Sequence, residues 1–239
     1  MITKSFKEYN SIEGSVVTIG TFDGIHLGHQ DIIHKLKEIS NKKKLKSIVL
    51  SFFPHPKIVL QNSTDIKLIN TLDEKVEILK KYNIDYFIIK EFTKEFSRLT
   101  ALAFVRDILV NTLNAKHLIV GYDHHFGRNR VANIIQLREF GEIYDFEVTE
   151  ISPRKINDIS ISSTKIRALL KEGKIDCANK YLDEYFVLTG MVVKGMGRGK
   201  LLGFPTANIK IKDEHKLIPN KGVYIVASCI DSKIYYGMM

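Results

Sequence analysis

Residues 16–29 read Val16-Val17-Thr18-Ile19-Gly20-Thr21-Phe22-Asp23-Gly24-Ile25-His26-Leu27-Gly28-His29, and this segment predicts a strand that leads directly into a helix. Branched apolar residues at 16–19 predict a buried strand, and the apolar positions from Ile32 to Ile39 recur at helical spacing. The glycine-containing turn between them therefore joins a strand to the N-terminus of a helix. Unpaired backbone N–H groups and the positive end of the helix dipole favour a phosphate at such a turn.

Two histidines, His26 and His29, stand three residues apart in this turn. Their imidazoles can donate hydrogen bonds to an anion at the helix N-terminus, and glycine lets that anion approach the backbone. Each histidine has a structural alternative, as a helix cap or as a partner in a core hydrogen bond. The position between the first strand and the first helix favours ligand binding.

The same alternation of strand and helix continues through the first two thirds of the chain. Further strands are predicted at Ile48 to Phe53, Tyr86 to Ile89, His117 to Val120 and Glu147 to Ile151. Amphipathic segments lie between them, for example from Leu102 to Leu113. We therefore predict an α/β fold with a Rossmann-like, doubly wound parallel sheet, whose ligands bind beyond the carboxyl ends of the strands.

The pattern changes after a last helical stretch, Thr164 to Leu182. Glycines then separate short strand-like pieces such as Phe186 to Val193. We expect two domains, at residues 1–184 and 185–239. Only about four strands can be placed in the second, fewer than the five of the smallest closed barrels, so a partial β-barrel is predicted.

A second phosphate-binding candidate is Ile161-Ser162-Ser163-Thr164-Lys165-Ile166-Arg167, at the start of the last helical stretch. Hydroxyl side chains there are good helix caps, which is the structural alternative. Lys165 and Arg167 add the fixed positive charge that a triphosphate needs, and arginine can bind phosphate oxygens in a bidentate manner.

The two elements together resemble the bacterial bifunctional riboflavin kinase and FMN adenylyltransferase family, often called FAD synthetase, over essentially the whole chain. The family has a nucleotidylyltransferase-type domain followed by a β-barrel riboflavin kinase domain. The resemblance implies His26, His29 and Arg167 as catalytic residues. It implies ATP binding by Gly20, Phe22, Asp23, Gly24, Gly28, Ser162, Ser163, Thr164 and Lys165.

The resemblance extends to segments that follow the second and fourth predicted strands. These are Phe53-Pro54-His55-Pro56, Gly121-Tyr122-Asp123 and Phe126-Gly127. It implies flavin binding by Phe53, Pro54, His55, Pro56, Asp123, Phe126 and Gly127. The chain departs from the family at His124 and His125, which replace a more usual aromatic and basic pair, and at 131–133, which replaces a usual glycine-containing stretch.

The segment from Gly195 to Asn208 resembles the riboflavin kinase signature. The resemblance implies a nucleotide and metal site made by Gly195, Gly197, Lys200, Thr206 and Asn208, with Lys200 where arginine is commoner. Glycines suit a phosphate loop, and oxygen ligands suit Mg²⁺. The family's glutamate base lies further downstream, so we expect these 239 residues to make FAD from FMN but little or no FMN from riboflavin.

Composition narrows the class of protein. The formal charge of +9 suits nucleic acid, a membrane surface or a polyphosphate. No apolar run is long enough for a membrane span and the N-terminus lacks a secretory signal, so a cytoplasmic protein is expected. The two cysteines, Cys177 and Cys229, lie far apart, so no disulfide framework is expected.

The predicted reaction is ATP plus FMN giving FAD plus pyrophosphate, with Mg²⁺ as cofactor. The expected partners are ATP, FMN and riboflavin, with no nucleic acid and no membrane, and the oligomeric state stays open. Two alternatives also stay open. One is a nucleotidylyltransferase for pantetheine phosphate or nicotinamide mononucleotide, and the other is a nucleic-acid or regulatory binding module without turnover.

Overall fold

The computed structural model describes residues 1–10, 12–61, 66–156, 159–197, 199, 203–204, 206–231 and 233–239. Its centre is a six-stranded sheet in the order β1-β4-β3-β2-β5-β6, and every neighbouring pair is parallel. The strands are β1 (Ile2–Ser5), β2 (Ser15–Ile19), β3 (Lys46–Phe53), β4 (Tyr86–Glu91), β5 (Ala115–Gly121) and β6 (Glu147–Ile151). The predicted α/β fold is confirmed.

The inner strands are mostly apolar and buried, as expected for strands with helices over both faces of the sheet. Neighbouring residues of one strand enter different cores: Val16 packs with Leu36 on one face, and Val17 packs with Leu109 on the other. Strand β1 was not predicted. Its sequence Ile-Thr-Lys-Ser lies mostly exposed at the sheet edge, so no apolar run marks it.

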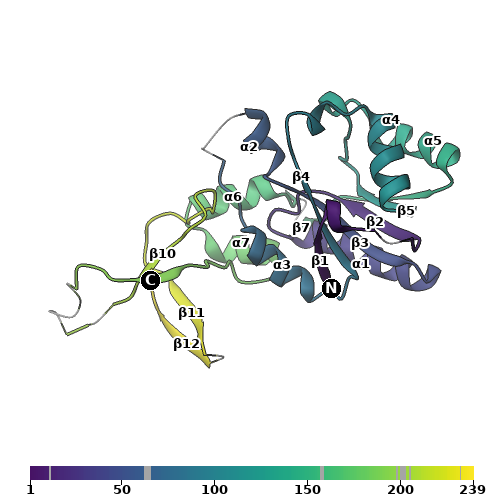
Figure 1. Cartoon of the computed structure of the whole chain (residues 1–239). Helices are drawn as coiled ribbons and strands as arrows, with labels where there is room; N and C mark the ends of the chain where they lie inside the picture. The colour runs from purple at the N-terminus through teal and green to yellow at the C-terminus, as the bar shows by residue number, and fades with distance from the viewer. Residues whose placement is uncertain are drawn as a thin grey trace.

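Helices α1 (Leu27–Lys43) and α3 (Leu72–Lys80) supply the first core. The opposite core is supplied by the π-helix η3 (Phe104–Thr112), which follows the short α4 (Ala101–Ala103), and by α5 (Ile134–Tyr144). Figure 1 shows α4 and α5 on one side of the sheet and α1 on the other.

The predicted helical stretch from Thr164 to Leu182 is two helices, α6 (Ser163–Lys171) and α7 (Ile175–Leu182). The break falls at Gly173, whose φ of +75° suits glycine. The remaining short elements of this part are η1 (Phe6–Glu8), α2 (Pro56–Gln61), η2 (Phe96–Arg98), η4 (Arg128–Arg130), β7 (Lys155–Ile156) and β8 (Ile159–Ser160).

The last part of the chain forms two separate antiparallel pairs among its described residues. β9 (Met191–Val193) pairs with β10 (Asn208–Lys210), and β11 (Ile225–Ile230) pairs with β12 (Lys233–Met238). The strand expected over 186–193 is therefore shorter than predicted. Apolar side chains such as Val192, Ile225 and Tyr236 are exposed on these pairs, because a two-stranded sheet cannot bury them.

One segment beyond residue 185 returns to the first part of the chain. Leu217 is buried in a third core with Ile69 and with Ile166 and Leu170 of α6. The two parts of the chain are therefore in contact through Leu217 as well as through the covalent connection near residue 184. Within the described residues, no helix is both long and apolar enough to span a membrane.

Candidate active site

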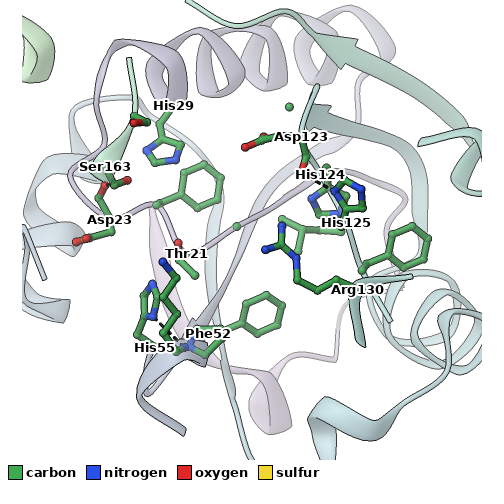
Figure 2. A pocket seen from close by; sticks show the side chains of 18 of the residues that line it. Thr21, Asp23, His29, Phe52, His55, Asp123, His124, His125, Arg130 and Ser163 are labelled. Carbon is green, nitrogen blue, oxygen red and sulfur yellow. Dashed lines mark hydrogen bonds between the residues drawn. The ribbon is translucent and has the colours of Figure 1, made fainter. Parts of the chain in front are cut away.

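A cavity of about 970 Å³ lies at the carboxyl ends of the parallel strands (Figure 2). Ile19, Phe52, Phe92, Gly121 and Ile151 line it, and each lies at or just beyond the end of a different strand. The doubly wound topology predicts a ligand site at this edge. Its volume lies at the upper end of the range of about 300–1,000 Å³ for small-molecule pockets.

The turn after β2 has a strained backbone. Phe22, Gly24 and Ile25 have φ angles of 47°, 92° and 38°, a region that a branched residue such as isoleucine rarely adopts. Burial of the Phe22 and Ile25 side chains holds the turn, and Gln30 Nε2 donates to the carbonyls of Ile25 (3.0 Å) and Leu182 (2.8 Å). The backbone is therefore fixed before any ligand binds.

His26 and His29 lie at the start of α1, with His26 at the N-cap position. Their rings stack with centroids 3.8 Å apart and planes inclined by 16°. Burial lowers the pKa of His26 to about 4 and the pKa of His29 well below its usual value. Both imidazoles are neutral at pH 7, so they offer N–H donors rather than fixed positive charge.

Asp23 and Arg167 form an ion pair with Nη1 and Oδ2 2.5 Å apart, and the Asp23 side chain is 3% exposed. The other carboxylate oxygen accepts from the backbone N–H groups of Ile69 (2.8 Å) and Asn70 (3.3 Å). Burial raises the pKa of Asp23, and the charges of Arg167 and Lys75 oppose that shift. Asp23 therefore orients the guanidinium, which stays partly exposed toward the cavity.

Lys75 lies beneath the same turn and was missed by sequence reasoning. Its ammonium donates to the Thr21 carbonyl at 2.5 Å, and burial lowers the pKa of Lys75 to about 8 against the opposing effect of Asp23. Its position in α3 could have indicated this burial, because Lys75 lies four residues before the buried Leu79 and therefore on the same face of the helix.

The opposite half of the cavity contains a chain of phenylalanines that sequence reasoning also missed, apart from Phe126. Phe52, Phe92 and Phe96 contact one another with ring centroids 5.5–5.8 Å apart, and Phe104 continues the chain to Phe126. The basic side chains on this side are Lys94, Arg98, Arg128 and Arg130. An apolar, aromatic wall beside cationic groups suits a planar ring system that carries a phosphate.

The predicted departure from the family lies in this half. Burial lowers the pKa of His124 to about 4, and its ring stacks on Phe126 with centroids 5.9 Å apart. His55, from the predicted flavin segment that follows the second predicted strand, also has its pKa lowered to about 4 by burial. Figure 2 shows His124, His125 and Arg130 on the side of the cavity opposite Asp23 and Ser163.

The structure brings most of the predicted site residues to this cavity. Those that line it are Gly20, Phe22, Asp23, His26, Gly28, His29, His55, Pro56, Asp123, Phe126, Gly127, Ser162, Ser163, Thr164 and Arg167. Ser163 Oγ donates to the Asp23 carbonyl at 2.8 Å, so the two distant phosphate motifs are in direct contact.

Several predicted residues lie outside the lining. Gly24 packs against Ile69, Phe53 is 45% exposed, Pro54 follows it outside the cavity, and the Lys165 ammonium lies 3.3 Å from the Ser160 carbonyl. The predicted kinase residues Gly195, Gly197, Thr206 and Asn208 are exposed away from this cavity, and Lys200 lies outside the described residues.

Fold and site together define an α/β protein with a large cavity at the carboxyl ends of its parallel strands. The FAD synthetase family model matches residues 8–165, and the riboflavin kinase family model matches residues 182–239. The chain belongs to the bifunctional riboflavin kinase/FMN adenylyltransferase family of transferases.

Two relatives and one solved structure illustrate the similarity. The Buchnera aphidicola subsp. Schizaphis graminum bifunctional riboflavin kinase/FMN adenylyltransferase is 40% identical over 237 residues, covering 98% of this chain and 74% of that protein. The Listeria monocytogenes protein of the same name is 37% identical over 224 residues, covering 93% and 70%. A crystal structure described as a macrolide-efflux protein from Streptococcus pneumoniae has a TM-score of 0.91 at 31% identity, covering 100% of this chain and 78% of that one.

Proposed function

We propose that the chain transfers AMP from ATP to FMN, giving FAD and pyrophosphate. The observation that carries this proposal is one continuous cavity that joins a helix N-terminal phosphate site to an aromatic wall with cationic neighbours. An FMN phosphate oxygen attacks the α-phosphorus of ATP, and the bond between the α-phosphorus and the bridging oxygen breaks. Pyrophosphate leaves with that oxygen.

The first half of the cavity is assigned to ATP. The N-terminus of α1 has no acidic residue in its first turn, and its helix dipole favours an anion there. His26 and His29 are neutral and act as hydrogen-bond donors to the α- and β-phosphates. Arg167 supplies the positive charge, and its contacts with Asp23 and Thr164 hold its planar group in place.

The second half is assigned to FMN. Its flavin ring packs against Phe92 and Phe96, and Arg128 and Arg130 attract its phosphate. That phosphate has a second pKa of about 6, so it is mostly dianionic at pH 7 and needs no general base. The protein then has to position two polyanions in line and stabilise the charge that develops, which is a matter of geometry and electrostatics.

Mg²⁺ is proposed as the cofactor. The described residues contain no group of three or more clustered His, Cys, Asp or Glu side chains that would hold a metal by themselves. Mg²⁺ in nucleotide sites is usually held by substrate phosphates with one or two carboxylates, and the exposed Asp123 in the lining fits that role. When bound, Mg²⁺ neutralises charge on the transferring and leaving phosphates.

Residues 185–239 are proposed to belong to a riboflavin kinase domain, with residues 1–184 as the adenylyltransferase domain. A Cβ atom at Gly195 would lie 1.9 Å from Asn208 Nδ2, so a larger residue at this position would displace the side chain of the predicted Mg²⁺ ligand. Lys200 and Thr206 complete the proposed site. The proposed location is the cytoplasm, with ATP, FMN and riboflavin as partners and neither nucleic acid nor membrane.

Substrate competition tests the assignment of the second half. The chain is incubated with ATP and Mg²⁺ and with an equimolar mixture of FMN, nicotinamide mononucleotide and pantetheine phosphate, and the products are separated. FAD should dominate, because only the flavin has a ring that covers the phenylalanine wall. A product mixture led by either of the other adenylylated compounds would reject the flavin assignment.

A further inference from the structure

Lys216 comes from beyond the predicted boundary at residue 184, yet its side chain is completely buried against the first part of the chain. Its ammonium donates to the carbonyl of Ile69 at 2.5 Å and to Glu74 Oε2 at 2.6 Å. The ring of Phe186 lies 4.4 Å from the same nitrogen. Glu74 is 3% exposed on its side chain and also accepts from the backbone N–H of Thr189 at 3.0 Å.

The backbone around Lys216 is docked as firmly as its side chain. Leu68 donates to the His215 carbonyl at 2.6 Å and accepts from the Leu217 N–H at 2.8 Å, as in a parallel sheet. Lys67 Nζ donates to the Glu214 carbonyl at 2.6 Å. The segment 213–220, which we call the docking segment, is thus fixed alongside residues 67–69.

These contacts continue to the ATP half of the cavity in two steps. The peptide that joins Ile69 to Asn70 accepts from Lys216 at its carbonyl, and its N–H, on Asn70, donates to Asp23 Oδ1 at 3.3 Å. The N–H of Ile69, in the preceding peptide, donates to the same oxygen at 2.8 Å. Asp23 Oδ2 holds the Arg167 guanidinium. The Lys216 ammonium therefore holds the backbone at residues 69 and 70 in place. That backbone holds the Asp23 carboxylate, which in turn orients Arg167.

A requirement for stability alone does not explain a lysine at this position. Replacing a buried ion pair with apolar side chains of similar volume is often neutral or stabilising, because the desolvation of both charges opposes their attraction. An apolar residue cannot donate a hydrogen bond to the Ile69 carbonyl, whereas Lys216 does. The specific effect of Lys216 is therefore to fix the backbone geometry of residues 69 and 70.

We propose that Lys216 is a positioning residue for ATP, acting through Ile69 and Asp23 on Arg167. The docking segment is then a structural part of the adenylyltransferase site, and a fragment that ends near Asp183 lacks it. This proposal rests on the proposed function only in taking the Arg167 side of the cavity as the ATP half. It concerns ATP binding, which is measured without turnover.

The test compares Lys216→Met with Lys81→Met in the full chain. Lys81 also pairs with a glutamate near the domain junction, Glu184, but its side chain is 61% exposed. Calorimetry with a non-hydrolysable ATP analogue and Mg²⁺ gives one dissociation constant, and FMN fluorescence gives the other. Lys216→Met should weaken binding of the analogue by about tenfold, the order of one lost charge-assisted hydrogen bond from Arg167, while FMN binding stays within about twofold. Lys81→Met should change neither.

A double-mutant cycle separates positioning from general destabilisation. In an Arg167→Ala background, Lys216→Met should cause little further loss of analogue binding, because the group it orients is gone. If Lys216→Met fails to fold, Glu74→Gln with Lys216→Met removes both buried charges and should still weaken the analogue selectively.

Three results would overturn the proposal: analogue binding equal to that of the unsubstituted chain, parallel weakening of the analogue and FMN, or additive losses in the cycle. FAD formation by the unsubstituted chain is scored separately. A chain that binds the analogue but makes no FAD would reject the proposed function and leave the positioning test intact.

Discussion

The imidazole rings of His26 and His29 stack with their centroids 3.8 Å apart, over the strained turn that ends at α1. Two adjacent buried imidazoles disfavour a proton on either, because burial penalises the charge and the charges would repel. The sequence pattern predicted two hydrogen-bond donors to an anion at this position. In the structure the two histidines are a pair of neutral donors.

His29→Ala should lower FAD formation at least tenfold, equivalent to about 1.4 kcal/mol of transition-state stabilisation, because one donor to the transferring phosphates is lost. Steady-state kinetics with saturating FMN measures the effect. His34→Ala, on the exposed side of the same helix, is the matched control and should be near normal. Near-normal turnover by folded His29→Ala would remove His29 from the site.

Acid should weaken the fold in a defined pH window. Burial lowers the pKa of His26 to about 4, against about 6.5 in an unfolded chain. Between these values the unfolded state binds a proton that the native state does not, so the free energy of unfolding falls as the pH falls, by up to about 1.4 kcal/mol per pH unit for each such histidine.

Urea unfolding from pH 7 to pH 5 measures this slope. His26→Asn should flatten it relative to the unsubstituted chain, and His34→Asn should leave it unchanged. An identical slope in His26→Asn would mean that His26 is protonated in the native state as readily as in the unfolded chain.

Arg167→Lys keeps the positive charge at the ATP half of the cavity but removes the planar guanidinium. The guanidinium contacts Asp23 and Thr164 and is proposed to bind the ATP phosphates. ATP affinity should weaken about tenfold, an effect typical of losing charge-assisted hydrogen bonds, with FMN affinity little changed. Binding titrations with each ligand alone measure both constants. Weaker FMN binding with unchanged ATP binding would reverse the assignment of the two halves.

Phe96→Ala is the converse substitution at the FMN half. Phe96 contacts Phe52, Phe92 and Phe104, so its removal opens the wall on which the flavin is placed. FMN affinity should fall by about 2 kcal/mol or less, the order of a lost aromatic stack, while ATP affinity is retained. Phe96→Leu keeps apolar volume, so its FMN affinity should lie between those of the unsubstituted chain and Phe96→Ala. Equal loss of FMN and ATP affinity in Phe96→Ala would indicate a damaged fold instead.

The sequence predicted the features that depend on local pattern. Continuous apolar runs marked five of the six parallel strands, and the glycine and histidine turn marked the start of α1. Strand β1 escaped because an exposed edge strand needs no apolar run. The helix break at Gly173 escaped because the apolar spacing continues on both sides of it.

Features assembled from distant segments were beyond sequence reasoning. The chain of phenylalanines in the cavity contains residues from positions 52 to 126, which are far apart in the sequence and share no short motif. Lys75 and Lys216 look like surface lysines until tertiary contacts bury them. The charge state of His26 and His29 depends on burial, which a sequence pattern does not specify.

Transfer of a labelled α-phosphate shows directly whether the chain moves AMP from ATP to FMN. The chain is incubated with FMN, Mg²⁺ and ATP labelled at the α-phosphorus or, in parallel, at the γ-phosphorus. The α-label should appear in FAD, the γ-label should appear in pyrophosphate, and the two products should form in equal amounts. Release of labelled inorganic phosphate without FAD, or transfer of the γ-label to FMN, would contradict this transfer of AMP.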